Sequence, residues 1–425
     1  MADMFEESVD PPLGIAFAFI VLIPTTAFYF ALSGSLGAGT LIACLLLASL
    51  LLTAVPQNDG AFGELLGRVL VPWGAVSIAV LALLSVHGLV ASLFQPFDGA
   101  RAASSAVMLP ILLLGGWSLA VMVAKAPEGV VVPVARWIVV PLFVVSVLAS
   151  LGFWITIPVS RAMEKPIFPF TEPSHLVLAM MPFYAIATIG SRGFTRLALL
   201  AGGPVVILGI ENLTLAVGWL IIFAACAHRV LIILAAALFA IALPLMDVSY
   251  FVDRLTFSGT DNLSALVFLQ GWELMAESLL RSSGWGQGFQ QLGVHGTQTA
   301  SSYLIFALLQ SDANILDGGF TAAKLVSEFG VFGILLVLLF LFLAVRSFFR
   351  LRRMSRSAEA IDQTRLYVDA VQIALLVELM VRGTGYFTGS IVVLISALVL
   401  RFAYLRDGAP GSRMAIGRPL EPAEA

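Results

Sequence analysis

Apolar runs of about twenty uncharged residues recur along this chain, and they decide which folds it can adopt. A helix of that length spans the roughly 30 Å hydrocarbon core of a bilayer. The chain is 60% hydrophobic and 12% charged, whereas a soluble domain carries roughly 25% charged residues. The runs are continuous, which favours helices over the alternating strands of an outer-membrane barrel. We therefore predict an all-α, polytopic helical membrane protein.

Twelve membrane spans are predicted. They cover residues 13–32, 36–55, 70–94, 105–124, 134–157, 174–190, 196–210, 213–227, 229–246, 329–348, 366–381 and 388–405. The spans 196–210 and 213–227 are short, so we interpret them as tilted neighbours joined by a tight turn at Glu211–Asn212. The polar stretch 247–328 is predicted to be a large capping loop within one integral-membrane domain, residues 1–425.

Lysine and arginine positions predict the orientation. The arginine-rich loop 346–365 is expected to be cytoplasmic, and both termini then lie on the same side. This topology puts most basic residues in the cytoplasm and seven outside: Arg101, Arg161, Lys165, Arg254, Arg281, Lys324 and Arg382. The loop 247–328 is then periplasmic in a Gram-negative inner membrane. The acidic first ten residues lack a basic signal-peptide region, so we expect the first span to be retained.

The large loop is predicted to be structured. Asp261 or Asn262 can cap a helix that runs to about Arg281, and a second helix is expected at about 298–310. The glycine run Gly284–Gly288 follows a helix rather than a strand, so we interpret it as a turn for close backbone approach and not as a nucleotide loop.

The stretch Thr171–His175 opens the sixth span. Pro173 suits a first helical turn, and Thr171 or Ser174 can cap it. Glu172 and His175 are three residues apart and can share a face. This pattern is compatible with a simple capped helix end or with a carboxylate and an imidazole facing a polar substrate.

Two further charge pairs are expected at the same membrane face. Lys324 and Glu328 are four residues apart, as are Glu378 and Arg382. Either is a structural ion pair or part of a site. The turn Arg382–Tyr386 presents an arginine, the natural bidentate ligand for a diphosphate.

Metal and cofactor binding are not predicted. Cys44 and Cys226 lie in apolar runs and are interpreted as buried hydrophobic residues. The histidines, among them His87 and His228, show no ligand spacing. Nucleic acid is not an expected partner.

Several segments, taken in order, resemble the Wzy-type O-antigen and exopolysaccharide polymerases, which are related to the O-antigen ligases. They are Phe168–His175, Asn212–Gly218, the stretch from Asn262 through Gln270–Trp272 to Gly284–Gly293, the stretch from Asp317 to Gly330, and Arg382–Phe387. The ligases usually have a His-Asn pair where this chain has Asp317–Gly318, which favours a polymerase.

The resemblance implies a glycosyltransferase that joins undecaprenyl-diphosphate-linked oligosaccharides at the periplasmic face, without metal or nucleotide. A chain-length-regulating co-polymerase is an expected partner, beside membrane lipids. Electrostatic stabilisation of the leaving diphosphate suits Arg254 and Arg382, with Lys324 and Arg281 as second choices. The base is Glu172, His175 or Asp317. Supporting positions are Glu328, Glu378 and Tyr386.

Other classes stay open at this point. An O-antigen ligase would transfer finished polymer to a lipid A core. A lipid-linked oligosaccharide flippase or transporter would favour buried charges near mid-span, and spans 13–124 carry almost none away from their ends. A non-catalytic assembly scaffold is the third alternative.

Overall fold

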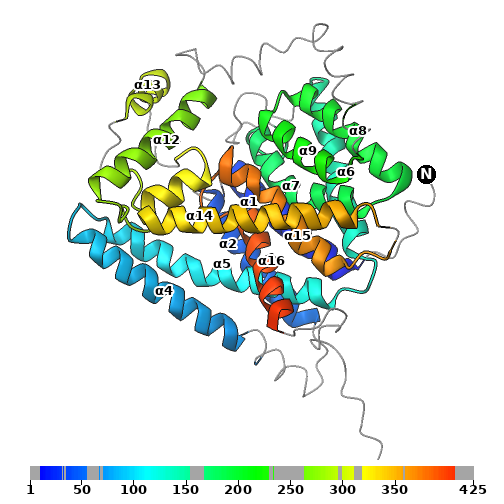
Figure 1. Ribbon diagram of the computed structural model, residues 1–425, viewed down its shortest axis with the longest axis horizontal. Coiled ribbons are helices and arrows are strands. Elements are labelled where there is room, and N and C mark those ends of the chain that lie inside the picture. Colours follow the sequence, from blue (N-terminus) through cyan, green and yellow to red (C-terminus); the bar gives the residue numbers. More distant parts are fainter. Residues whose placement is uncertain are drawn as a thin grey trace, which may run out of the picture.

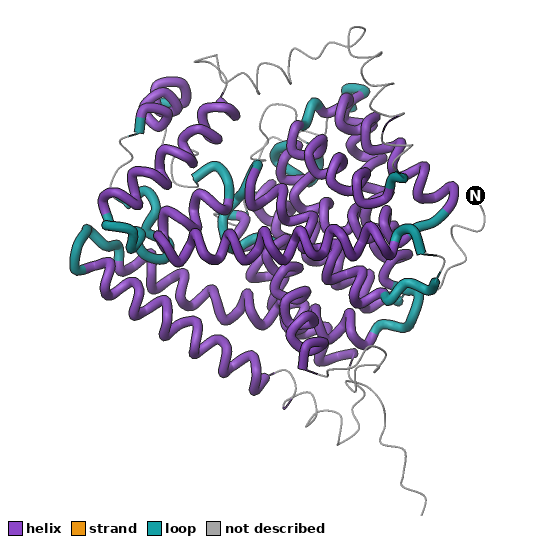
Figure 2. The backbone as a smooth tube through the Cα atoms, in the orientation of Figure 1, coloured by secondary structure: helices purple, strands orange, loops and turns teal. Residues whose placement is uncertain are grey.

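The structure is a computed structural model that describes residues 10–30, 32, 35–54, 67, 70–153, 167–228, 233, 263–294, 299–310, 318–357 and 359–406. The regular elements of this part of the chain are all helices, joined by loops and turns (Figures 1 and 2). Its helices are α1 (Pro11–Tyr29), α2 (Leu36–Ala54), α4 (Val71–Ser92), α5 (Gly99–Lys125), α6 (Val131–Ser150), α7 (Pro173–Gly190), α8 (Gly193–Ile210), α9 (Leu213–Cys226), α12 (Leu263–Arg281), α13 (Ala300–Leu309), α14 (Thr321–Met354), α15 (Gln363–Met380) and α16 (Gly389–Arg406).

Nine helices of the described residues are long and apolar enough to cross a membrane. Eight of them coincide with predicted spans: α1, α2, α4, α5, α6, α7, α8 and α14. The ninth, α12, is the least apolar and lies in the predicted capping loop. The all-helical, multi-pass class is therefore confirmed. The predicted span 229–246 lies mostly outside the described residues, and the count of twelve stays a prediction.

Local signals located several elements well. The predicted helix up to Arg281 is α12, and the predicted helix 298–310 is α13. The expected turn between the two short spans is also present. Glu211 adopts a left-handed conformation there, and the Asn212 side chain accepts a hydrogen bond from Leu215 N at 2.9 Å, which caps α9.

Helix α7 lies at the centre of the bundle. It packs against α6, α9 and α15, and every residue from Met180 to Ile189 is buried. Outer helices instead expose apolar side chains, for example Ile78 and Leu83 of α4 and Leu335 and Phe342 of α14. Such surfaces suit contact with lipid. The middle and the end of α7 are thus enclosed by neighbouring helices.

At one end of the bundle, Arg196 and Arg356 bind backbone carbonyl groups of neighbouring segments, and we call this end the basic end. Arg196 Nη1 donates to Ser355 O at 2.9 Å, and Arg356 Nη2 donates to Ala227 O at 3.2 Å. Cations beside helix C-termini are favourable because of the helix dipole. The start of α7 and the end of α15 lie at the opposite end, where the candidate site is found.

Helix α14 is kinked at Gly330, which has φ 57° and ψ −129°. The glycine run packs against this kink: Gln287 N donates to Ser327 O at 2.9 Å, and Gly288 N donates to Glu328 O at 2.8 Å. A Cβ on Gly286 would lie 2.5 Å from Glu328 O. The interpretation of this run as a close backbone approach is confirmed.

Candidate functional site

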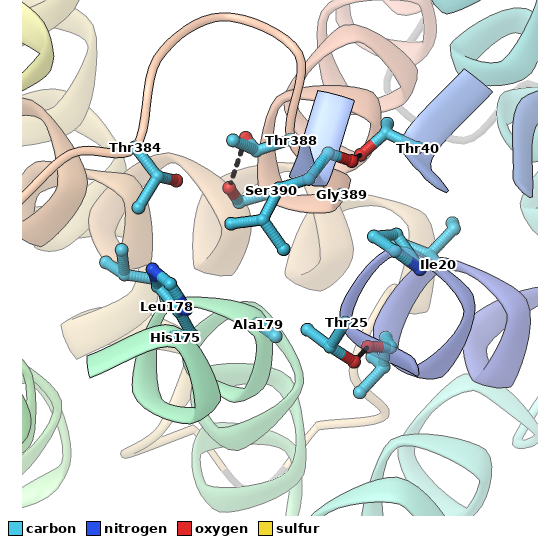
Figure 3. Close-up of a pocket in the computed structure, with 13 residues that line it drawn as sticks. Ile20, Thr25, Thr40, His175, Leu178, Ala179, Thr384, Thr388, Gly389 and Ser390 are labelled. Atoms are coloured by element: carbon cyan, nitrogen blue, oxygen red, sulfur yellow. Dashed lines mark hydrogen bonds between the residues drawn. The ribbon is translucent and has the colours of Figure 1, made fainter. Parts of the chain in front are cut away.

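A small pocket lies between α1, α2, α7 and α16 (Figure 3). Its walls combine apolar side chains such as Ile20 and Leu178 with five hydroxyl groups, those of Thr25, Thr40, Thr384, Thr388 and Ser390. His175 of α7 is the titratable side chain of the lining. An apolar hollow with a few convergent polar groups is the usual form of a ligand site.

The His175 ring is held by residues that precede α7. Thr171 Oγ1 lies 2.8 Å from Nδ1, and Glu172 Oε1 lies 3.2 Å from Nε2. Glu172 and His175 thus lie side by side, as their three-residue spacing allows. The predicted caps are wrong: Glu172 itself is the N-cap, and it makes no side-chain capping bond. The Thr171 and Ser174 hydroxyls bind the His175 and Glu172 side chains instead.

Arg382 joins this cluster from a distant part of the chain. Its Nη2 donates to Glu172 Oε1 at 3.4 Å. The predicted ion pair between Glu378 and Arg382 does not form, because α15 ends at Met380 and the i,i+4 spacing no longer applies. The following loop lies against α14, where Gly383 N donates to Gly319 O at 3.0 Å. A Cβ on Gly383 would lie 2.4 Å from Thr321 Oγ1, so glycine allows this approach.

Lys324 and Glu328 also lie near this loop. Both are buried, at 3% and 0% exposure. Each has its own contact rather than a direct ion pair: Lys324 Nζ lies 5.3 Å from the centroid of the Tyr386 ring, and Glu328 Oε1 accepts from Leu292 N at 3.4 Å. Glu328 Oε2 and the Tyr386 hydroxyl make no hydrogen bond of normal geometry among the described residues.

Glu378 lies behind the pocket hydroxyls. Its Oε1 accepts from Thr388 Oγ1 at 3.3 Å, and Thr388 Oγ1 lies 2.9 Å from Ser390 Oγ (Figure 3). The carboxyl is 2% exposed, and its Oε2 has no partner among the described residues. A buried carboxylate that accepts from Thr388 fixes where that hydroxyl proton points.

The electrostatics of the cluster favour an ionised Glu172. Burial alone would raise the pKa of this carboxyl, but His175, Arg382 and Ser174 together lower the pKa below its ordinary value. All three partners contact Oε1, so Oε2 takes part in none of these contacts. Glu172, His175 and Arg382 are 22%, 14% and 23% exposed, which leaves them open to a ligand.

The other predicted site residues lie elsewhere. Arg281, at the end of α12, pairs with Glu277 at 2.5 Å, is half exposed and does not line the pocket. Arg254 and Asp317 are outside the described residues. The pocket hydroxyls were not predicted, because serine and threonine in apolar helices commonly bond to their own backbone. Thr25 and Thr40 do so, donating to Val21 O and Leu36 O.

Fold and pocket together define a multi-pass helical membrane protein with a polar site at one end of its bundle. Within the described ranges, no three His, Cys, Asp or Glu side chains gather closely enough to hold a metal ion. In comparisons with known proteins, no family model, no curated protein and no solved structure matches the chain.

Proposed function

We propose that this protein is a polysaccharide polymerase that joins polyprenyl-diphosphate-linked oligosaccharide units at the periplasmic face of a bacterial inner membrane. The observation that carries the proposal is the cluster of Glu172, His175 and Arg382, in which His175 also lines the hydroxyl-bearing pocket. A cation, a carboxylate and saccharide-binding hydroxyls are the groups that this glycosyl transfer requires.

Orientation supports the proposed side of the membrane. The arginines of loop 346–365 belong to the basic end, whereas the pocket lies at the other end of α7 and α15. Basic loops are retained in the cytoplasm. The pocket would then face the periplasm, where lipid-linked units carry their own activated bond and no nucleotide is required.

Arg382 is proposed to bind the diphosphate. One of its five N–H donors is used by Glu172, at a long 3.4 Å, so the planar guanidinium keeps donors for a phosphate. Lys324 of α14 is buried against Tyr386 of the loop after α15, and it adds a second positive charge. Charge developing on the leaving diphosphate would be stabilised most strongly in such a poorly solvated place.

Glu172 is proposed as the base. An acceptor hydroxyl attacks the anomeric carbon of the donor, its proton passes to Glu172 Oε2, and the bond from carbon to the diphosphate oxygen breaks. The products are the extended lipid-linked chain and free polyprenyl diphosphate. His175 holds Glu172 through Oε1, and Thr388 and Ser390 orient sugar hydroxyls. Arg254 and Asp317 remain proposed contributors from outside the described residues.

The decisive experiment uses purified protein in nanodiscs with one lipid-linked repeat unit. A ladder of longer lipid-linked products, formed without nucleotide, supports the polymerase. Products appearing only when a lipid A core acceptor is added identify the ligase reaction instead. Unchanged donor under both conditions overturns the proposed glycosyl transfer. The purified Glu172→Gln protein provides the matched blank.

A flippase is the second candidate, because ionisable side chains are buried within the bundle. Glu328, Glu378 and Asp369 are all at most 2% exposed, and buried membrane charges often mark transport pathways. Proteoliposomes separate the two functions. Movement of the intact repeat unit across the bilayer, with no chain growth, favours the flippase.

A further inference from the structure

A second polar cluster, distant from the pocket, links α14, α15 and α16. Arg350 Nε donates to Asp369 Oδ2 at 2.8 Å, and Ser347 Oγ donates to Asp369 Oδ1 at 2.8 Å. Arg401 Nη1 donates to the Gln372 amide oxygen at 2.6 Å. Asp369 and Gln372 are 2% and 1% exposed, so these two residues form the buried part of the cluster.

The cluster lies just inside the basic end. Ser347 precedes Ser355, which binds Arg196 at that end, by eight residues. At 1.5 Å per residue this is a depth of about 12 Å. Guanidinium groups at that depth reach the headgroup region by extending along the helix, as basic side chains near the ends of membrane helices do.

Positive charge exceeds negative charge in this cluster. Arg346 and Arg350 lie close enough to Arg401 to interact with it electrostatically, and Asp369 is the carboxylate that acts on Arg401. Three guanidinium groups therefore share one carboxylate among the described residues. The surrounding surface is apolar and faces outward, with Phe342, Val345, Phe349 and Phe402 all more than half exposed. A counter-charge suited to this surface would come from a lipid.

Gln372 provides an independent indication of a missing ligand. Its amide oxygen accepts from Arg401 and from Ser347, so the Nε2 donors need an acceptor of their own. Nε2 is buried and has no acceptor among the described residues. A buried donor without an acceptor costs roughly 1–3 kcal/mol, so an oxygen ligand or a water is expected beside it.

We propose that Arg346, Arg401 and Gln372 bind the phosphate of an anionic phospholipid from the leaflet at the basic end. Guanidinium groups bind phosphate oxygens in bidentate fashion, the Gln372 amide supplies a neutral donor, and the exposed phenylalanines contact the acyl chains. Arg350 is the positioning residue, because Asp369 already holds it. This site is independent of the proposed polymerase reaction.

Native mass spectrometry of the full-length protein tests the site. Phosphatidylglycerol and phosphatidylcholine with identical acyl chains compete for the detergent-purified protein. We expect retained phosphatidylglycerol in clear excess, and about a tenfold loss of that excess in Arg346→Gln/Arg401→Gln. The control, Arg353→Gln/Arg365→Gln, removes the same charge from the basic end outside the cluster and should keep the excess.

Three results would overturn the proposal. They are equal retention of the two lipids, an equal loss in the control double variant, and competition by inorganic phosphate at the lipid concentration, which would identify a free-anion site. The thermal midpoint of each variant in phosphatidylcholine, compared with that of the parent, verifies folding. A misfolded double variant is replaced by Gln372→Leu, which removes the amide donor and should lower the excess of phosphatidylglycerol.

Discussion

Arg382 donates a hydrogen bond to Glu172 from 210 residues further along the chain. The contact joins the loop after α15 to the N-cap of α7, and it brings a cation and a carboxylate to His175, which lines the pocket. On the α7 side the cluster belongs to a helix that packs against α6, α9 and α15.

Replacing Arg382 should lower the rate of the proposed reaction far more than replacing an arginine outside the Glu172 cluster. We expect Arg382→Ala to lower the rate of chain extension by about 100-fold or more, because a donor aimed at developing charge is lost. Arg382→Lys should recover part of this rate, since it restores charge without the bidentate fork. The length distribution of lipid-linked products measures both.

Arg281→Ala is the matched control for Arg382, because Arg281 pairs with Glu277 on its own helix and takes no part in the Glu172 cluster. It should leave product lengths nearly unchanged. Normal products from Arg382→Ala, with the protein present in the membrane, would remove that arginine from the site.

Glu172 should make stability depend on pH. Its pKa is depressed in the folded protein, so the stabilisation is fully present above its ordinary value of 4.5 and is lost as pH falls through the lower folded pKa. The thermal midpoint of Glu172→Gln should therefore lie below that of the parent at neutral pH, and the gap should narrow under acid conditions. If the difference between the two thermal midpoints instead widens in acid, the pKa of Glu172 is not lowered in the folded protein.

Removing the pocket hydroxyls should weaken saccharide binding. Thr388→Val and Ser390→Ala together delete the hydroxyl pair in front of Glu378 and leave a buried carboxylate without its donor. We expect roughly tenfold weaker binding of the lipid-linked unit, measured by titration in nanodiscs. Thr53→Val, an exposed hydroxyl on α2, is the control. If the double variant and the Thr53→Val control bind the lipid-linked unit equally well, the pocket hydroxyls do not bind the saccharide.

Gly286→Ala should destabilise the fold without touching the pocket. Gly286 has φ +93°, and an added Cβ would lie 2.5 Å from Glu328 O. Strain of this kind costs about 1–3 kcal/mol. Gly74→Ala, where an added Cβ meets nothing within 4 Å, should be neutral or slightly stabilising. Thermal unfolding in detergent compares them, and similar midpoints would contradict the described backbone contact.

Sequence patterns located the helices of this protein better than its contacts. Apolar length predicts α1 to α8, and the expected tight turn at Glu211–Asn212 predicts the start of α9. The pairing of Glu172 with His175 is local, so its spacing was sufficient. The partner of Arg382 was not predictable in this way, because it depends on where α15 ends and on which helix packs beside it.

The pocket hydroxyls illustrate the same limit. Nothing in the apolar runs around Thr25 and Thr40 distinguishes them from hydroxyls that only bond to their own helix, and both do bond so. They become part of one pocket only because the fold brings α1 and α2 next to the start of α16. Buried Glu378 likewise has its partner, Thr388, beyond the end of its own helix.

The kink at Gly330 divides α14 into two segments with different roles. Residues 331–354 alone rise about 36 Å, enough to cross a hydrocarbon core without help from the preceding turns. The segment 321–329 is therefore not needed to cross the hydrocarbon core. It can follow α12 instead and carry Lys324 and Glu328 to the loop after α15. One glycine lets a single helix serve as both membrane anchor and wall of a site.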